Sequence, residues 1–339
     1  MSIQIEKNKS LKAYNTFGID AIAPYFCQIT TLEELQEVLQ MEQFRHMPML
    51  MIGGGSNLLF TTNPAGLVIL NRIGGISIEK EDDAHVWVRV GGGQNWHDFV
   101  IYTIAQGWGG LENLSLIPGT VGAAPMQNIG AYGVEIKDTF SHLEAVARDT
   151  GQVRIFVNEE CEFGYRSSIF KTHAKDQYII ASVTFRLNKQ HSFNTSYGDI
   201  QKTLAELGEE ISLQAISRAV VQIRQSKLPD PKQLGNAGSF FKNPVISRAL
   251  FLELQQEYPS MPHYPQTEDW VKVPAGWLIE HCGWKGHRRG NIGVHERQAL
   301  VIVNYGGATG AEIKQLSQDI QASVAQKFRI PLEAEVNFI

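Results

Sequence analysis

The 339-residue sequence has few cysteines and no long apolar run, and both absences narrow the class of protein. The three cysteines, Cys27, Cys161 and Cys282, are widely separated and form no CxxC pair. A disulfide framework and a structural zinc site are therefore not expected, and free thiols suit a reducing cytoplasm. No apolar run approaches the roughly 18 residues that a membrane-spanning helix needs. The polar residues 1–10 do not resemble a signal peptide either.

An excess of positive charge is also missing. The 30 Lys and Arg residues are outnumbered by 35 Asp and Glu residues, which gives a formal net charge of −5. This balance offers no electrostatic reason to bind nucleic acid or an anionic membrane. Any anionic ligand must be held by locally placed Arg, Lys or backbone N–H groups. No repeat of fixed period is present, and we expect no metal site and no obligate protein partner.

Length and hydrophobic content point to a globular protein of two or three domains. The chain exceeds the roughly 100–200 residues of a typical domain, and 43% of its residues are hydrophobic. Apolar periodicity predicts strands and helices that alternate. The predicted strands are 49–52, 86–90, 143–147, 153–157, 178–187, 299–303 and 332–339. The predicted helices begin after Thr31, Asn95, Ser212 and Thr309, and the last carries an apolar stripe that ends at Phe328.

A glycine-rich loop directly follows the first of these strands, at residues 53–57. Consecutive N–H groups in such a turn can form a concave site for phosphate, because glycine permits close backbone approach. The dinucleotide fingerprint G-x-G-x-x-G is not met, since its last position is Leu58. An ordinary turn remains the alternative for this loop.

Residues 117–133 are poor in charge and rich in small residues and proline. Such a segment suits a backbone wall that lies against a large, flat cofactor. A buried connector between subdomains is the alternative interpretation.

Several polar residues are candidates for binding or catalysis. Arg166 lies between an aromatic residue and two serines, and Arg224 and Lys227 share one face of a predicted helix. Two fixed cations suit a carboxylate or a diphosphate, although a solvated basic face is the alternative.

A loop serine and a terminal carboxylate complete the set of candidates. Ser239 follows a glycine and precedes two aromatic residues, which suits a nucleophile or a proton donor. It lacks the G-x-S-x-G elbow of an α/β-hydrolase. Glu335 alternates with apolar residues in the last predicted strand and faces either water or a cleft.

Taken together and in this order, the motifs resemble one family. GGGSN, PGTVGAAPMQNIGAYG, GYRSS, RQSKLPDP, NAGSFFKNP, PAGWLIE, HERQAL and LEAEV are similar to the motifs of UDP-N-acetylenolpyruvoylglucosamine reductases. The resemblance covers essentially the whole chain. The tyrosine in residues 130–133 resembles that of the subtype whose mobile tyrosine loop closes over the substrate.

The resemblance implies an α+β fold. A vanillyl-alcohol oxidase-like (PCMH-type) FAD-binding domain of two α/β subdomains would be followed by a C-terminal α+β substrate-binding domain. We expect the first subdomain at 1–72, joined by the C-terminal strand 331–339. The second subdomain is expected at 73–213 and the substrate-binding domain at 214–330.

The resemblance also assigns roles to individual residues. It implies that FAD is bound without a covalent link, by Gly53, Gly54, Gly55, Ser56, Asn57, Ile117, Pro118, Gly119, Thr120, Gly122, Ala123 and Gln127. The implied catalytic residues are Arg166 and Glu335, which would stabilise an enol intermediate, and Ser239, which would donate a proton. The implied substrate-binding residues are Tyr132, Tyr197, Arg224, Lys227, Asn243 and Gln298. The resemblance also implies arginine two positions after Glu335, where this chain has Asn337.

The implied activity is the NADPH-dependent reduction of UDP-N-acetylglucosamine enolpyruvate to UDP-N-acetylmuramate in peptidoglycan precursor synthesis. NADPH would act as a co-substrate that reduces the flavin, and the protein would orient and polarise the reactants. Two alternatives remain at this point. One is a flavin oxidase of the same superfamily that acts on a hydroxy acid. The other is a nucleotide-sugar or flavin-binding protein without enzymatic activity.

Overall fold

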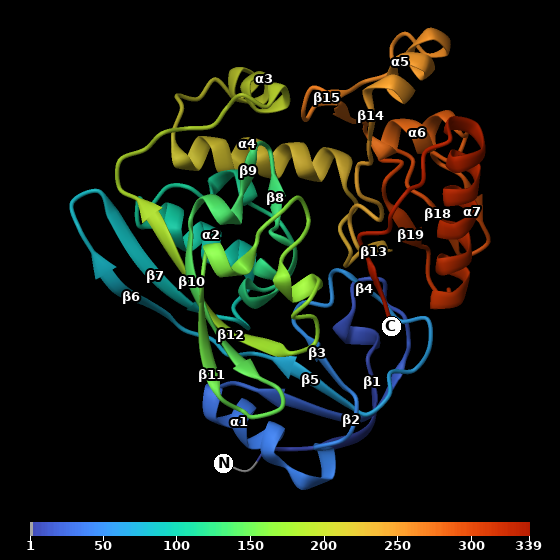
Figure 1. The fold of residues 1–339 in the computed structure, drawn as a ribbon. Helices are drawn as coiled ribbons and strands as arrows, with labels where there is room; N and C mark the ends of the chain where they lie inside the picture. The colour runs from blue at the N-terminus through green and yellow to red at the C-terminus, as the bar shows by residue number, and fades with distance from the viewer. Residues whose placement is uncertain (1–2) are drawn as a thin grey trace. The chain divides into compact units, whose positions relative to one another are not determined.

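The computed structural model describes residues 3–339, which divide into two compact units (Figure 1). Unit 1 comprises the described residues up to Lys9, together with Ile22–Gly55 and Pro64–Ser226. Unit 2 comprises Ser10–Ala21, Ser56–Asn63 and Lys227–Ile339. The chain passes between the units several times, so neither unit is a single stretch of sequence. The predicted division at residues 72, 213 and 330 stays a prediction.

The first sheet of unit 1 has four strands. Across the sheet these are β1 (Glu6–Ser10), β2 (Ile22–Ile29), β5 (Leu67–Asn71) and β3 (Met49–Ile52). The central strand β5 pairs in parallel with both β2 and β3. Helix α1 (Leu32–Gln40) begins at Thr31, whose side chain accepts a hydrogen bond from the N–H of Glu34. Its predicted apolar face is buried at Leu35, Val38 and Leu39.

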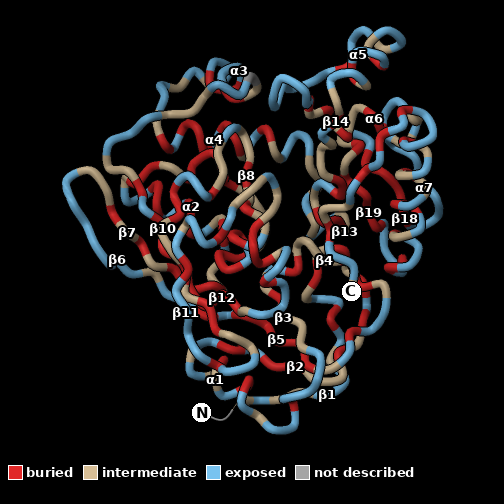
Figure 2. The backbone as a smooth tube through the Cα atoms, in the orientation of Figure 1, coloured by how far each residue is buried: buried red, intermediate tan, exposed pale blue. Residues whose placement is uncertain are grey.

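The second sheet of unit 1 is antiparallel and has five strands. In order these are β11 (Val153–Val157), β10 (Phe140–Ala147), β12 (Tyr178–Asn188), β7 (His85–Gly91) and β6 (Ile76–Glu81). Most of β12 is buried, as Figure 2 shows. Helix α2 (Trp96–Ala105) packs on this sheet, because its Phe99 ring lies 5.4 Å from that of Phe185 in β12. A second apolar cluster joins Val146 and Ile179 of this sheet to residues of the first sheet, so the two sheets form one unit.

Short elements and two further helices complete unit 1. A small hairpin joins β8 (Gly130–Ala131) to β9 (Val134–Glu135). Helices α3 (Gly198–Leu207) and α4 (Leu213–Lys227) share an apolar cluster that includes Ile200, Leu204, Ile216 and Val220. The predicted cap of α4 is present, since the Ser212 hydroxyl accepts from the N–H of Ala215. The 3-10 helices of this unit are η2 (Glu42–Phe44), η3 (Glu112–Leu114), η4 (Val121–Ala123), η5 (Pro125–Gln127), η6 (Ile136–Asp138), η7 (Glu159–Cys161) and η8 (Ile169–Lys171).

Unit 2 contains short strands, the 3-10 helix η1 (Lys12–Tyr14) and three helices. One sheet has the order β13 (Gly235–Asn236), β19 (Ile302–Asn304), β18 (Ile292–Val294) and β17 (Arg288–Arg289). A second has the order β14 (Val245–Ser247), β16 (Trp270–Lys272) and β15 (Tyr264–Pro265), and β20 (Asn337–Phe338) pairs with β4 (Leu58–Leu59). The helices are α5 (Arg248–Glu257), α6 (Ala275–His281) and α7 (Gly310–Phe328).

Helix α7 matches its sequence signals closely. Thr309 and Glu312 form the predicted capping box, in which each side chain accepts a hydrogen bond from the other residue's backbone N–H. The predicted stripe is fully buried at Ile313, Leu316, Ile320, Val324 and Phe328. No helix within residues 3–339 is long and apolar enough to cross a membrane.

The predicted terminal strand 332–339 is largely wrong. Only Asn337–Phe338 forms a strand, and Phe338 is 38% exposed although it continues the predicted apolar face. The preceding residues pair with a different segment, since Glu335 donates its N–H to the carbonyl of Phe240 and Lys242 donates to that of Glu333. The segment changes partner midway, so no continuous ladder forms. The strand predicted at 299–303 is also shorter and lies at Ile302–Asn304.

The three cysteines are free thiols with different accessibility, which gives a first prediction. Cys27 and Cys161 are buried, and burial raises the pKa of both thiols to about 12. Because the thiolate is the reactive form, neither should react with a disulfide reagent at pH 8 in the folded protein. The half-buried Cys282 should react alone, and Cys282→Ser should abolish this reaction. Denaturant should expose all three thiols, and rapid modification of Cys27 or Cys161 before unfolding would contradict the packing.

Candidate functional site: a glycine-lined cradle and two groups of polar side chains

The loop after β3 lies unusually close to the backbone of Gly119 and to the side chain of Thr120, both in unit 1. A Cβ atom added at Gly53 would overlap the Thr120 hydroxyl, and one at Gly54 would lie 2.8 Å from the Cα of Gly119. Only glycine permits this approach, because a side chain at either position would displace the facing segment. Two predicted FAD-binding stretches, 53–55 and 117–123, therefore meet in this unit. Ser56 and Asn57, the last residues of the loop, fold with unit 2.

The glycine run at residues 91–93 also supports the segment 117–123. The N–H of Gly122 donates to the carbonyl of Gly92 at 2.8 Å, and a Cβ at Gly92 would lie 2.6 Å from the carbonyl oxygen of Ile180. Further along, the Ser168 hydroxyl donates to the carbonyl of Met126, and the Lys171 ammonium lies 3.1 Å from Gln127 Oε1. Residues 91–93 were not predicted to belong to the site. Their signal was available, since they repeat the pattern of a strand that runs into three glycines.

This arrangement fits a flat, phosphate-bearing cofactor. The segments that meet carry little side-chain bulk, so their polar atoms are mostly backbone groups of the kind that bind a diphosphate or a flavin ring. Phosphate charge does not require a lysine or arginine inside the loop, because oriented N–H dipoles can hold it.

Two arginines and two tyrosines gather elsewhere in unit 1. Arg166 has a left-handed backbone (φ 52°) and donates to the carbonyl of Gly130 at 2.7 Å. Arg224 on α4 hydrogen-bonds to the side chain of Tyr132 and donates to the carbonyl of Leu116 at 3.2 Å. The rings of Tyr132 and Tyr197 meet edge to face, with their centroids 5.5 Å apart. Residues that lie up to 92 positions apart in the sequence, from Tyr132 to Arg224, thus form one cluster.

The electrostatics of this cluster favour an anion. Burial lowers the pKa of the Arg224 guanidinium, the Tyr132 phenol partly opposes this decrease, and the charge of Arg166 adds to it. The guanidinium remains charged in a protein, so the lowered pKa indicates that an anion at this point would be stabilised.

Asn113 holds the tyrosine loop in place, and sequence reasoning missed it. Its buried side-chain amide donates to the carbonyl of Tyr132 at 3.0 Å and to that of Asn194 at 2.9 Å. Asn194 in turn donates to the carbonyl of Gly133. Because both bonds use backbone acceptors far away in the sequence, no local pattern could have revealed this role.

In unit 2, Ser239 and Glu335 lie on neighbouring extended segments. The backbone hydrogen bond from Glu335 N–H to Phe240 C=O is 2.8 Å long, and Ser239 directly precedes Phe240. The rings of Phe240 and Phe241 are buried and anchor the loop, whereas Ser239 is exposed. The structure therefore brings together the two unit-2 members of the predicted catalytic set. The third member, Arg166, belongs to unit 1.

Two of the three remaining predicted residues of unit 2 meet at the start of α6. The side-chain oxygen of Asn243 accepts from the N–H of Ala275 at 2.9 Å. Gln298 Oε1 would lie 3.2 Å from a Cβ added at Gly276 and accepts from the N–H of Leu300. Lys227 is the last residue of α4 and is exposed. Arg224 and Lys227 do share this helix, as their spacing predicted.

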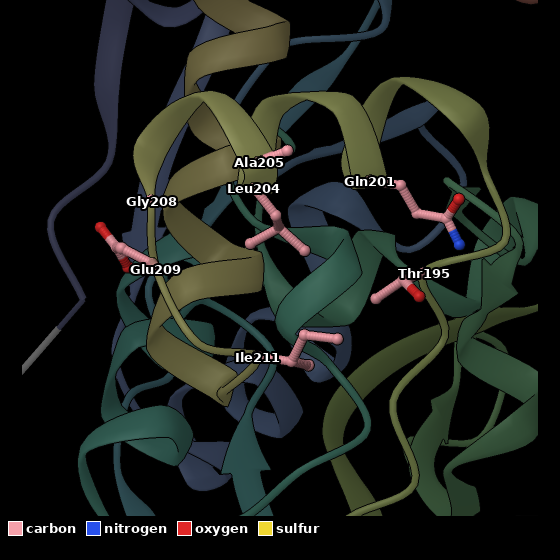
Figure 3. Close-up of a pocket in the computed structure, with 7 residues that line it drawn as sticks. All are labelled: Thr195, Gln201, Leu204, Ala205, Gly208, Glu209 and Ile211. Carbon is pink, nitrogen blue, oxygen red and sulfur yellow. The ribbon is translucent and has the colours of Figure 1, made fainter.

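A pocket visible on the surface of unit 1 is a separate feature. It lies between α3 and the segment that leads to α4 and is lined by Thr195, Gln201, Leu204, Ala205, Gly208, Glu209 and Ile211 (Figure 3). None of the predicted site residues lines it, so we assign it no part in the chemistry. Among residues 3–339, no group of three or more His, Cys, Asp or Glu side chains could hold a metal ion.

Family models match most of the chain. Residues 23–156 match an FAD binding domain family. Residues 230–339 match the family described as the C-terminal domain of UDP-N-acetylenolpyruvoylglucosamine reductase.

Solved structures resemble this chain over nearly its whole length. The crystal structure of the enzyme named UDP-N-acetylenolpyruvylglucosamine reductase from Thermus caldophilus has a TM-score of 0.70 at 23% identity and covers 99% of both chains. A solvent-stable cholesterol oxidase has a TM-score of 0.52 at 13% identity, over 98% of this chain and 87% of that one. At these identities the likeness concerns the fold alone. Together with the two family models, it confirms the predicted α+β fold with its vanillyl-alcohol oxidase-like FAD-binding domain.

Curated relatives are similar over the full length. Proteins named UDP-N-acetylenolpyruvoylglucosamine reductase from Flavobacterium johnsoniae and Amoebophilus asiaticus are 52% and 51% identical, and each alignment covers 99% of this chain and 100% of the relative. One from Pseudomonas putida is 49% identical, over 99% of both chains. On this evidence the chain belongs to the UDP-N-acetylenolpyruvoylglucosamine reductase family.

Proposed function

We propose that this chain reduces UDP-N-acetylglucosamine enolpyruvate to UDP-N-acetylmuramate, with NADPH as co-substrate, in the synthesis of peptidoglycan precursors. Membership of the family makes the chain an FAD-dependent oxidoreductase. The structural observation that carries the proposal is the hydrogen bond between Phe240 C=O and Glu335 N–H. It brings the backbone next to Ser239 beside that of Glu335, which supports a role for both residues at one site.

The cofactor would be held by backbone groups of the two segments that meet in unit 1, together with Ser56 and Asn57 of the glycine loop. FAD, when bound, would supply the redox chemistry that carries reducing equivalents from NADPH to C3 of the enolpyruvyl group. The chain's own contribution is to bind, orient and polarise.

The anionic parts of the nucleotide sugar would be bound by cations placed locally, since the net charge of the chain is −5. Arg224, with the Tyr132 hydroxyl beside it, and Lys227 are proposed for the anionic groups. Tyr197, Asn243 and Gln298 are proposed to contact the remainder of the substrate.

The proposed catalytic residues act on charge that develops at C2 and spreads into the substrate carboxylate. Arg166 would stabilise this charge more strongly in the transition state than in the ground state, and Glu335 would share a hydrogen bond with the enol form. Ser239 would then donate a proton to C2. Its suitability rests on position, because an alcohol is a weak acid.

We also propose a cellular compartment for the reaction. We place the protein in the cytoplasm, where free thiols persist, and the three cysteines here are free. We propose that it functions without an obligate protein partner.

The cofactor prediction is the most direct. The purified protein should be yellow, and acid precipitation should release FAD into the supernatant, because no covalent link is expected. The flavin in the supernatant and in the precipitate is measured from the absorbance spectrum of each fraction. Flavin that remains with the precipitated chain would contradict a non-covalent site, and reduction of the flavin by a hydroxy acid without NADPH would favour the oxidase alternative.

A second prediction concerns Lys227. Lys227→Ala should weaken binding of the nucleotide sugar about tenfold, the effect of losing a charge-assisted hydrogen bond of roughly 1.5 kcal/mol, and should leave the FAD content unchanged. Titration of the flavin absorbance with substrate measures the affinity. The exposed Lys232→Ala is the matched control and should bind like the unmodified protein. Equal affinities for the two variants would remove Lys227 from the site.

A third prediction separates the two half-reactions through Ser239. The proton is needed only after reducing equivalents reach the substrate, so Ser239→Ala should retain near-normal flavin reduction by NADPH. Reoxidation by the substrate should slow by about 10²–10⁴-fold, which corresponds to at least about 3 kcal/mol of barrier. Stopped-flow absorbance follows each half-reaction. The exposed Ser260→Ala is the control, and equal slowing of both halves in Ser239→Ala would make Ser239 a structural residue.

A further inference from the structure

Leu116 has a strained backbone directly before the predicted flavin-binding segment. Its φ of 58° lies in the left-handed region, which a residue with a Cβ adopts only when its surroundings fix it. Both of its backbone polar groups are fixed. The N–H donates to His97 Nδ1 at 3.0 Å, and the carbonyl accepts from Arg224 Nε at 3.2 Å. Because these bonds lie on opposite sides of the Cα atom, together they set both backbone dihedrals.

The bond from Leu116 to His97 belongs to a wider set of contacts with the first turn of α2. Trp96 Nε1 donates to the carbonyl of Leu114, and the Trp96 N–H donates to the carbonyl of Gly119. On the other side, the hydroxyl of Ser217 on α4 lies 2.8 Å from that of Ser115. Residues 114–119 are thus held between α2 and α4. Among the side chains that make these contacts, only the ring of His97 titrates near neutral pH.

His97 can accept the Leu116 N–H only when Nδ1 carries no proton. Burial lowers the pKa of His97, the neighbouring Asp98 on α2 opposes this, and the charge of Arg224 on α4 lowers the pKa further. The segment 114–116 contributes no charged side chain to this environment. Protonation would convert the acceptor into a donor that faces the Leu116 N–H, and it would place a second cation near Arg224.

We propose that His97 is a positioning residue that sets Leu116 and thereby links the flavin-binding segment to Arg224 and Tyr132. The chain of contacts runs from His97 through Leu116 to Arg224, and from Arg224 to the Tyr132 side chain. The inference rests on the proposed function for the roles of the flavin segment and of Arg224. It adds that the geometry of both depends on one histidine that is not among the predicted site residues.

The lowered pKa fixes the direction of the pH dependence. Above the ordinary histidine value of 6.5, the ring is neutral in both the folded and the unfolded protein. As the pH falls below 6.5, the unfolded chain binds a proton before the folded one does, so stability declines until the lowered folded pKa is reached. Over the same range, a growing fraction of the folded protein loses the bond to Leu116, and FAD affinity declines with it.

Two substitutions at His97 separate this role from a general packing role. In His97→Asn, the side-chain oxygen can take the place of Nδ1 as an acceptor that does not titrate. In His97→Leu, no side-chain acceptor remains at this position for the half-buried Leu116 N–H. The exposed His173→Asn is the matched control.

The measurements are FAD dissociation constants and thermal unfolding midpoints of FAD-free protein, both at pH 7.5 and 5.5. At pH 7.5, His97→Asn should bind FAD within about twofold of the unmodified protein. His97→Leu should bind roughly tenfold more weakly, because the half-buried Leu116 N–H loses its acceptor and Leu116 is no longer fixed. Between pH 7.5 and 5.5, the unmodified protein and His173→Asn should lose more affinity and more stability than His97→Asn does.

The comparison between variants also removes the contribution of other histidines. Burial lowers the pKa of His295 in unit 2 as well, and this contribution is common to all variants. Equal pH dependence in His97→Asn and the unmodified protein would overturn the proposal, and so would unchanged FAD binding by His97→Leu at pH 7.5. If His97→Leu does not fold, the comparison of His97→Asn with the unmodified protein decides alone. Failure of the unmodified protein to bind FAD would instead contradict the proposed function, and the unfolding midpoints would still test the role of His97.

Discussion

Close contact between backbones that lack side chains is the constraint on which unit 1 depends. At Gly54 the facing atom is the Cα of Gly119, and a Cβ there would lie only 2.8 Å from it. Real Cβ atoms do not come so close, so a side chain at Gly54 would push residues 119–120 away from the glycine loop. The contact also needs support from both sheets. Strand β3 leads directly into the glycine loop 53–55. Gly92, after the end of β7, and Trp96, at the start of α2, make backbone hydrogen bonds to residues 119–122 and hold them in place. The stable sheets therefore position a site whose own residues supply little packing energy.

Elements whose signals are local could be predicted from the sequence. Strand β3 and helix α2 lie where the sequence predicted them. The signals are local in both cases: the cap of α2 joins Asn95 to the N–H of Asp98, and the apolar run of β3 ends at a run of glycines. Strand β11 also has the predicted bounds, but the pattern did not predict its surroundings. Val153, Ile155 and Val157 are exposed at 42%, 56% and 43%, while Phe156 is buried. An apolar alternation therefore predicts the strand without predicting which face is covered.

Features that depend on distant partners could not be predicted in this way. The terminal segment is extended as expected, but it pairs first near Phe240 and then with Leu58–Leu59, a choice that its own residues do not specify. Similarly, the environment of Arg224 arises from Arg166 and Tyr132, which are far away in the sequence. Arg166 was selected by resemblance to a family, since a lone arginine beside serines has no chemical signature of its own. Asn113 and His97 act on backbone atoms, and a backbone acceptor or donor leaves no trace in the sequence.

Asn337 shows how a departure from the family pattern can be accommodated. Its side-chain amide and its backbone N–H both donate to the carbonyl of Asn57 at 3.1 Å. Asn57 in turn donates its side-chain amide to the carbonyl of Glu335 at 3.2 Å. A short amide at position 337 thus ties the end of the glycine loop to the segment that carries Glu335. Asparagine brings no positive charge to this position, so under the proposed function the cations for anion recognition would be Arg166, Arg224 and Lys227. On the proposed function, the orientation of Arg224 would then matter for anion recognition, and with it the hydrogen bond that the Leu116 N–H donates to His97.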